Sequence, residues 1–447
     1  MSNNQFEKEE ETFEIEESKK KRFFFERNEI LILVGIFFLG FSTAMFAPYA
    51  PIWLESIFAV DSYFILGFVT IIPNLLIAIG TTVWGILADR FGKRKFVLMG
   101  FIASGLMYFV LLFVNTSLMF LLVMLIGYMF ISAQTSNVYA YATLTSSKTK
   151  ETILGEITAT FSIAWGVSSP IAGSIHDAAK NPNTFVSKLS SVLPNAFSHE
   201  IKANPDMGLQ LFIAVFVCII AFIIILFSRE DEKFETESNI DKAEIKKTKV
   251  TIFPIIFALI VITAFFQFAN SGGFWSFASV YFINTLDTSA IHFSYFLVAT
   301  TILGSILALL LGRVTRTGKI LLCIIAGMAV QVTIYSLMTI FPSKTILGLI
   351  VYSFPSYVVS NVSLYSLAGT FSNKMRRATA YGLYNTIGLS GSISATLILG
   401  LLADSSLSNY FSENIFIMLP ATLVLATLAF VFSLFLLLFI RKKKELI

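Results

Sequence analysis

Twelve long apolar stretches dominate this sequence, and short polar or charged breaks separate them. About 20 helical residues cross the apolar core of a bilayer, so each stretch can form one transmembrane helix. The composition agrees, because 56% of the residues are hydrophobic and only 13% are charged, which excludes an ordinary soluble enzyme. The sequence therefore predicts an all-α membrane protein with twelve transmembrane helices. The stretches begin near Ile30, Ser62, Phe96, Leu118, Thr152, Leu209, Thr251, His292, Ile320, Thr345, Ala378 and Asn414.

The distribution of basic residues predicts how the chain is oriented. Lys and Arg near helix ends are retained on the cytoplasmic side of a membrane. If the N-terminus is cytoplasmic, only Lys180, Lys188, Lys202 and Lys344 of the 32 Lys and Arg residues fall outside the cell. We therefore expect a multi-pass protein of the cell membrane with both termini in the cytoplasm.

Charge and polarity also predict the domain boundaries. Residues 1–28 form a polar, charged tail, which we expect to be disordered and cytoplasmic. Residues 229–250 are charged and lie midway, so they are interpreted as a cytoplasmic linker between six-helix bundles at 29–228 and 251–440. Residues 441–447 form a basic cytoplasmic tail.

The segment 177–208 is the longest predicted outer loop. A solvated connector is favoured over a ligand-binding lid, and residues 186–197 are compatible with a short surface helix. The sequence leaves these two roles of the loop open.

The two halves of the chain contain an internal repeat at an offset of 226 to 227 residues. This offset places Asp89 to Lys93 on Thr315 to Lys319, two segments at equivalent positions between the second and third helices of each half. Several matches at one offset favour duplication over coincidence. The other matched pairs are Gly155 with Gly382, Gly173 with Gly400, Asp177 with Asp404, and Gln134 with Asn361.

The sharpest motif is the segment Gly85 to Lys95, between the second and third predicted helices. Gly85 allows a neighbouring helix to approach closely, and Gly92 permits a tight turn. The basic run 93–95 suits anionic lipid headgroups, and the Asp89 carboxylate suits the positive end of a helix. A simple basic anchor would explain the run 93–95 but not Asp89 or the two glycines.

With the twelve helices and the repeat, this motif resembles the signature of the major facilitator superfamily, G-x-L-x-D-[RK]-x-G-[RK]-[RK]. Every position matches, and the closest likeness in style is to the twelve-helix drug and solute efflux branch. The resemblance implies two pseudo-symmetric six-helix bundles that expose a central cavity alternately to each side of the membrane. It also implies an inner-gate latch, in which Asp89 faces the start of helix 11 near Ala378 and Arg90 pairs with Glu156. Thr315 replaces the acid in the second copy, which predicts a weaker latch there. The implied latch residues are Gly85, Asp89, Arg90, Gly92, Lys93, Arg94 and Glu156.

The fifth predicted helix carries Gly166, Pro170 and Gly173. Proline removes a helix hydrogen bond, and small residues allow close helix crossing, so these three are interpreted as a hinge. The segment looks like a degraded form of the antiporter signature G-P-x-x-G-G of the same superfamily, with Ser169 and Ser174 replacing two glycines. A kinked packing helix is the alternative.

Amide side chains are the informative polar groups within the predicted spans, because an amide in lipid is costly unless it faces a partner or water. In the superfamily, helices 3, 6, 9 and 12 form an outer scaffold and the others line the cavity. Of eight such amides, only Gln331 lies on a predicted scaffold helix. Trp165 and Trp275 also lie within spans, where stacking on a solute competes with ordinary packing. The predicted cavity residues are Asn74, Gln134, Asn137, Trp165, Gln267, Asn270, Trp275, Asn361 and Asn385.

Other classes of site find little support in the sequence. The histidines, His176, His199 and His292, show no metal-ligand spacing, and there is no phosphate-binding loop for ATP. Cys218 and Cys323 lie in apolar stretches, which disfavours a disulfide or a thiolate metal site. Proton-coupled drug exporters of the superfamily that the chain resembles usually carry an Arg within helix 4 and often an acid within helix 1. This chain has neither, which disfavours charge-based proton coupling at the middle of the membrane. We expect no cofactor, no metal, no catalytic residues and no nucleic-acid partner.

The sequence thus predicts a secondary transporter that moves a small neutral or amphipathic solute by alternating access. Export is slightly favoured over uptake by a symporter or a uniporter, and a transport-silent membrane sensor is the alternative from another class. The expected partners are the solute, the lipid bilayer and a proton or sodium gradient. We expect a monomer.

Overall fold

The computed structural model describes residues 27–145, 150–181, 183–188, 199, 203–228, 254–315, 319–370, 377–405, 411 and 413–444. Most of the predicted N-terminal tail, the linker and part of the outer loop lie outside these residues. The described chain is helical throughout and contains no strand.

The N-terminal bundle begins with a helix at 27–46, which breaks at Pro48 and continues as α2. The second span begins with the short α3 and continues as α4, so that residues Tyr63–Ala88 form one apolar length. The labelled helices are α2 (Ala50–Ser56), α3 (Tyr63–Leu66), α4 (Phe68–Phe91), α5 (Lys93–Leu111), α6 (Ser117–Thr145), α7 (Lys150–Ala179), α8 (Phe185–Lys188) and α10 (Pro205–Leu226).

The C-terminal bundle repeats this plan. Its first span, α12, ends at Trp275 and is followed by a π-helix, and its fourth span is divided at Pro355 into α15 and α16. The elements are α12 (Pro254–Trp275), η3 (Val280–Thr285), α13 (Ala290–Thr315), α14 (Ile320–Ile340), α15 (Thr345–Tyr352), α16 (Ser356–Thr370), α17 (Arg377–Ala403), η6 (Asn414–Ile417) and α18 (Met418–Lys444).

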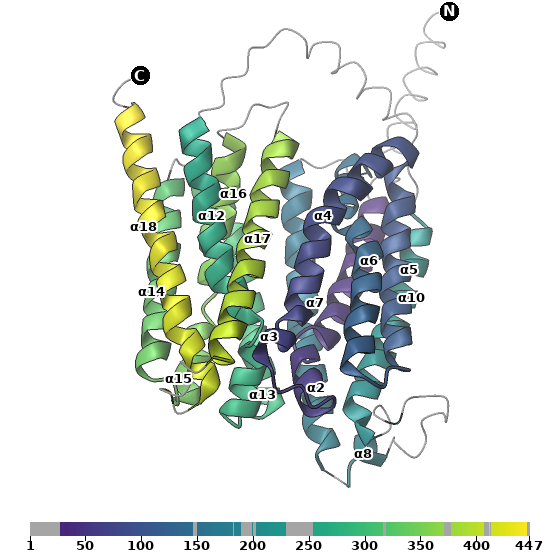
Figure 1. Ribbon diagram of the computed structural model, residues 1–447. Coiled ribbons are helices and arrows are strands. Elements are labelled where there is room, and N and C mark those ends of the chain that lie inside the picture. Colours follow the sequence, from purple (N-terminus) through teal and green to yellow (C-terminus); the bar gives the residue numbers. More distant parts are fainter. Residues whose placement is uncertain are drawn as a thin grey trace, which may run out of the picture.

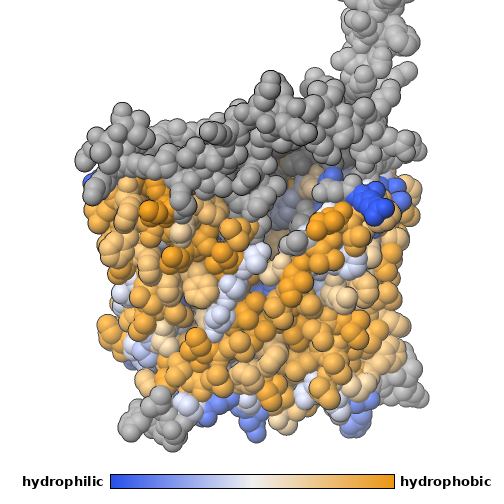
Figure 2. Space-filling model, turned by 45° about the horizontal axis from the view of Figure 1, so that its top comes forward, coloured by the Kyte–Doolittle hydropathy of each residue, from blue (hydrophilic) through white to orange (hydrophobic). Residues whose placement is uncertain are grey.

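These helices confirm the predicted all-α membrane architecture. Within the described residues, 11 helices are long and apolar enough to cross a membrane. The 30-residue α7 is long enough to be the twelfth and is the more polar one. Large apolar side chains cover the outer surface of both bundles, as expected where helices face lipid (Figure 2).

The two bundles stand side by side, with the end of α18 and the junction between α4 and α5 at the same end of the molecule (Figure 1). We call this the terminal end and the opposite one the distal end. The largest buried apolar cluster runs through both bundles and includes Phe46 and Tyr49 of one and Phe277 and Phe293 of the other. Two further buried clusters each belong to a single bundle, one around Ile225 and one in the C-terminal bundle. The hydrophobic core is therefore shared toward the distal end and divided toward the terminal end.

Candidate functional site

Two contacts at the distal end join the bundles through carboxylates. Asp177, in the last turn of α7, accepts hydrogen bonds from the backbone N–H groups of Ala290 (3.0 Å) and Ile291 (2.9 Å) at the start of α13. Helix N-termini carry unpaired N–H groups and a partial positive charge, so a carboxylate stabilises them. Asp177 of the N-terminal bundle therefore caps a helix of the C-terminal bundle.

The reciprocal contact is made by Asp404, just beyond the end of α17. Its carboxylate accepts hydrogen bonds from the Ser62 hydroxyl (2.6 Å) and from the backbone N–H groups of Tyr63 (2.9 Å) and Phe64 (3.0 Å). Here a residue of the C-terminal bundle caps the first turn of the second span of the N-terminal bundle.

The residues of these two contacts are related by the repeat offset found in the sequence. Adding 227 to Asp177 gives Asp404, and adding 227 to Tyr63 and Phe64 gives Ala290 and Ile291. We call the α7–α13 contact the first seam and the contact of α17 with α3 and α4 the second seam. The two seams are pseudo-symmetric copies of one interface.

Glycines bring the helices of the first seam into contact. A Cβ atom built on Gly173 would lie 2.2 Å from Oγ of Ser294 and 2.6 Å from the carbonyl oxygen of Ala290. One built on Gly166 would lie 2.9 Å from Oγ1 of Thr301. The structure keeps α7 helical through Pro170, so the two glycines act here as close-contact points, and the hinge stays a prediction.

The second seam is equally tight at the distal end. A Cβ atom on Gly67 would lie 2.9 Å from Cγ2 of Thr396. Further along α4, the Asn74 amide donates a hydrogen bond to Ser392 of α17 (3.2 Å). Asn74 is the repeat equivalent of Thr301, so a predicted cavity residue bridges the two bundles at the matching level of the other seam.

Beyond this level the bundles separate. Gly85 lies about 16 Å further along α4, and a Cβ atom there would meet no described atom within 4 Å. A Cβ atom on Gly155 of α7 would likewise meet no described atom within 4 Å, and Asn385 of α17 is exposed. In Figure 1, α4 and α17 lean apart toward the terminal end, and Figure 2 shows a furrow between the two apolar lobes there. The arrangement is a crevice that is closed at the distal end.

An aromatic pair lies between the bundles where the crevice ends. The rings of Trp165 (α7) and Trp275 (α12) have centroids 6.2 Å apart and planes inclined at 49°. The indole nitrogen of Trp165 is buried and has no hydrogen-bond partner. These two predicted cavity residues are brought together, one from each bundle.

Beside Trp275 lies a small cavity of about 20 Å³ between the broken first span and the end of α12. A volume of this size holds about one water molecule. The polar residues that line it are Thr70, Ser276 and Ser279. The floor of the crevice thus combines aromatic rings with neutral hydrogen-bonding groups.

The remaining predicted amides of the C-terminal bundle have distinct places. Gln267 is buried and its side-chain amide donates to the carbonyl of Tyr357 (3.3 Å), whereas the amide oxygen Oε1 has no partner among the described residues. Asn361 accepts a hydrogen bond from the hydroxyl of Tyr384 (2.5 Å), which joins α16 to α17.

The described contacts of three other predicted amides stay within their own bundles. Gln134 packs on Gly100 of α5, and Asn137 donates to the carbonyl of Ala133 (2.7 Å). Asn270 is fully buried. Its backbone carbonyl accepts a hydrogen bond from the hydroxyl of Tyr335 of α14, and both polar atoms of its side-chain amide lack a partner among the described residues. The contacts of Gln134 and Asn137 hold these two side chains within the N-terminal bundle.

The signature motif shows its turn clearly. Gly92 has φ 93°, a backbone conformation that favours glycine, and it separates α4 from α5. Arg94 donates to the carbonyl of Leu226 at the end of α10 (2.6 Å), so it supports its own bundle. The guanidinium of Arg90 lies 5.5 Å from the ring of Phe91.

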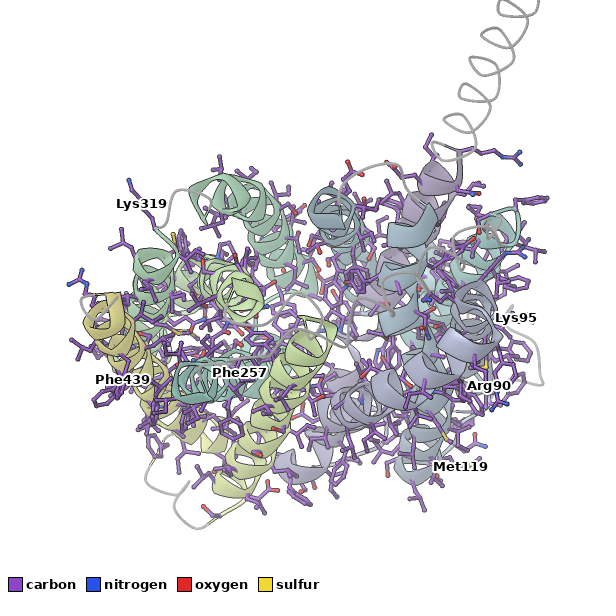
Figure 3. The ribbon with its side chains drawn as sticks, turned by 90° about the horizontal axis from the view of Figure 1, so that it is seen from above. Arg90, Lys95, Met119, Phe257, Lys319 and Phe439 are labelled. Carbon is purple, nitrogen blue, oxygen red and sulfur yellow. The ribbon has the colours of Figure 1, made fainter. Side chains whose placement is uncertain are left out.

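Figure 3 places Arg90 and Lys95 on the side of the N-terminal bundle that faces away from the C-terminal bundle. Lys93 and Glu156 are half-buried. The side chains of Asp89 and Ala378 lie outside the described part of the structure. The latch, including the pairing of Arg90 with Glu156, therefore stays a prediction.

Two polar contacts near Asp177 were not predicted from the sequence. The imidazole Nδ1 of His176 lies 2.8 Å from Oδ2 of Asp206 in the first turn of α10. The hydroxyl groups of Tyr49 and Ser294 lie 2.9 Å apart across the first seam. His176 and Asp206 are 30 residues apart, and nothing in their spacing signals the pair.

The fold is similar to that of solved transporters. A variant of the nucleoside transporter NupG shares 13% identity at a TM-score of 0.65, with 93% of this chain and 99% of that one covered. A bacterial homologue of the human lysosomal transporter Spinster, inward-facing and unoccupied, shares 12% identity at 0.69, with 92% and 97% covered. The D-xylose–proton symporter shares 11% identity at 0.68, with 92% and 96% covered. At such low identities these similarities establish the fold alone.

No curated protein sequence matches the chain. The sequence profile described as the Major Facilitator Superfamily matches residues 32–396, well over half of the chain. Together with the two pseudo-symmetric bundles, this match shows that the chain belongs to the Major Facilitator Superfamily.

Proposed function

We propose that this protein is a secondary transporter that carries a small neutral or amphipathic solute through the crevice by alternating access. The observation that carries this proposal is the pair of pseudo-symmetric seams, closed by Asp177 and Asp404 at the distal end while the bundles separate at the terminal end. Reversing which end is closed would expose the floor of the crevice to the opposite side of the membrane.

A neutral solute is favoured by the helices that form the seams. No Asp, Glu, Lys or Arg occurs in α4 before Asp89, in α7 between Glu156 and Asp177, or in α17 between Arg377 and Asp404. A charged solute would need a compensating charge in this low-dielectric region. The tryptophan pair and the amide of Asn74 instead offer stacking and neutral hydrogen bonds.

The orientation and direction belong to the same proposal. The basic residues support a cytoplasmic location for the terminal end of the protein in a cell membrane, so the crevice of this conformation would open to the cytoplasm. The degraded antiporter signature around Pro170 favours export over uptake. A proton or sodium gradient would drive a protein that acts as a monomer.

Binding and transport of neutral solutes by purified protein test the proposal. Neutral solutes with a ring, such as nucleosides and sugars, are screened for thermal stabilisation beside charged analogues, and uptake of the best ligand is measured in proteoliposomes. Trp165→Leu and Trp275→Leu should each lower the affinity by tenfold or more, because each removes half of the aromatic floor. Trp84→Leu is the matched control, since Trp84 packs on Phe96 and Phe130 within its own bundle.

Three outcomes would contradict the proposal. Stabilisation by charged analogues alone would exclude a neutral solute. Unchanged binding in both floor variants would remove the tryptophan pair from the site. Binding without accumulation under any pH or sodium gradient would favour the transport-silent sensor.

A further inference from the structure

Three buried amide side chains, which we call the amide layer, cross the interior of the C-terminal bundle. Gln267, Asn270 and Gln331 are 1%, 0% and 2% exposed. Among the described residues, no hydrogen-bond partner is found for Nδ2 and Oδ1 of Asn270, Nε2 and Oε1 of Gln331, or Oε1 of Gln267. A buried amide atom that finds no partner is costly, so a layer of them needs a physical reason.

The amides of α12 and α14 lie at one level of the bundle. The hydroxyl of Tyr335 donates to the backbone carbonyl of Asn270 (3.1 Å) and so reaches from α14 to α12. Side chains lean toward the start of their own helix, and Gln331 lies one turn before Tyr335. The tyrosine hydroxyl therefore marks the level at which Gln331 and Asn270 face the same interior, with Gln267 one turn before Asn270.

The N-terminal bundle shows that packing at this level does not require amides. Subtracting the repeat offset of 227 from the three residue numbers gives Gly40, Thr43 and Ser104. The hydroxyls of Thr43 and Ser104 each donate to a carbonyl of their own helix (2.9 Å in both cases). Small residues with satisfied hydrogen bonds thus fill the equivalent level of the other bundle.

The fourth spans of the two bundles differ at the same place. In the N-terminal bundle α6 is one continuous helix through Tyr128, whereas the equivalent span is broken at Pro355. A break frees backbone groups within the membrane, and ordered water is one of the partners that satisfies them. Gln267 donates to the carbonyl of Tyr357, two residues after Pro355, so the amide layer lies beside the break.

The unpartnered atoms decide which kind of ligand fits. They include both N–H donors and carbonyl acceptors, so a cation would leave the donors unpaired and an anion would leave the acceptors unpaired. The helices α12, α14, α15 and α16 contain no Asp, Glu, Lys or Arg to balance an ion. Water both donates and accepts, and a buried water molecule makes about two to four hydrogen bonds.

We propose that the amide layer is a water-binding site, which holds buried water molecules beside the break in the fourth span of the C-terminal bundle. The site belongs to one bundle only, because the repeat replaces its three amides and its proline in the other. It makes the interior of the C-terminal bundle hydrated at a level where the N-terminal bundle is dry.

The two bundles supply a matched pair of reporters for the test. X-ray irradiation converts bound water into hydroxyl radicals, which modify the side chains beside it. Tyr335 contacts Asn270, and its repeat equivalent Tyr108 is the internal control, because the two are 3% and 2% exposed. In purified full-length protein without any solute, Tyr335 should be modified several-fold faster than Tyr108.

Variants then assign the water to the amides. Asn270→Thr combined with Gln331→Ser copies the N-terminal bundle and should lower the rate of Tyr335 to that of Tyr108. Gln331→Leu keeps the volume of the side chain and should also lower the rate, which gives a second reading if the double variant does not fold. Mass spectrometry of the digested protein measures both rates in the same sample.

Two results would overturn the proposal. Equal rates for Tyr335 and Tyr108 in the parent protein would mean that the amides pair with one another instead of binding water. An unchanged rate for Tyr335 in the variants would mean that water reaches it without the amides. Neither result depends on a solute, so the water site and the transport proposal stand or fall separately.

Discussion

Asp404→Asn should open the distal end of the protein. The substitution keeps the size of the side chain but removes its charge and one acceptor, whereas the carboxylate accepts three hydrogen bonds from Ser62, Tyr63 and Phe64. Loss of a helix N-terminal cap costs about 0.5–2 kcal/mol. Because this contact is exposed to solvent, we expect a loss at the lower end of this range, about 0.5–1 kcal/mol, which changes the ratio of open to closed protein by about 2–5-fold.

Spin-label distances between Asn183→Cys and Ser343→Cys, in the background without native cysteines, measure this ratio. The matched control is Asp61→Asn, which removes a neighbouring exposed carboxylate outside the seam. Since the two seams are well separated, adding Asp177→Asn should multiply the effect rather than repeat it. An unchanged distance distribution in Asp404→Asn, or the same shift in Asp61→Asn, would refute the role of the carboxylate.

Two further substitutions test the glycines. Gly173→Ala should raise the ratio of open to closed protein by about fivefold or more, because its Cβ would press on a backbone carbonyl of α13 and overpacking costs about 1–3 kcal/mol. Gly155→Ala is its control and should leave the distal distance unchanged. Equal behaviour of the two variants would contradict the close contact. Gly92→Ala should lower the thermal unfolding midpoint, because a φ of 93° strains a residue with a side chain by about 1–3 kcal/mol. Gly85→Ala is the control and should leave the midpoint unchanged or slightly raised. A lower midpoint for Gly85→Ala than for Gly92→Ala would show that the turn does not need glycine.

The fold could be predicted from the sequence because the membrane fixes the length of each span. The twelve apolar stretches predicted the transmembrane helices. The most polar of these helices, α7, is recognised by its length and by its place in the order of helices. The breaks within three spans were not predicted. Pro48 and Pro355 accompany two of them, but Pro73 and Pro170 lie inside helices that stay continuous. A proline alone therefore does not indicate where a span is interrupted.

The site could be predicted only in part, because a polar residue in a span does not reveal which face of the helix it occupies. Asn74, Trp165 and Trp275 lie between the bundles, whereas the side chain of Asn137 donates to a carbonyl of its own helix. The internal repeat pointed to two further residues of the site. It had already matched Asp177 with Asp404, but only the structure showed that each caps a helix of the opposite bundle.

Locking the second seam gives the sharpest test of alternating access. Ser62→Cys and Asp404→Cys, in protein without its native cysteines, replace a hydroxyl and a carboxylate, whose oxygens lie 2.6 Å apart, by two thiols that a short, reducible cross-linker can join. The cross-linked protein should bind solute from the terminal end but transport none, and transport should return after reduction. Transport at the full rate by fully cross-linked protein would show that the distal end need not open, and the rocking of the two bundles would have to be abandoned.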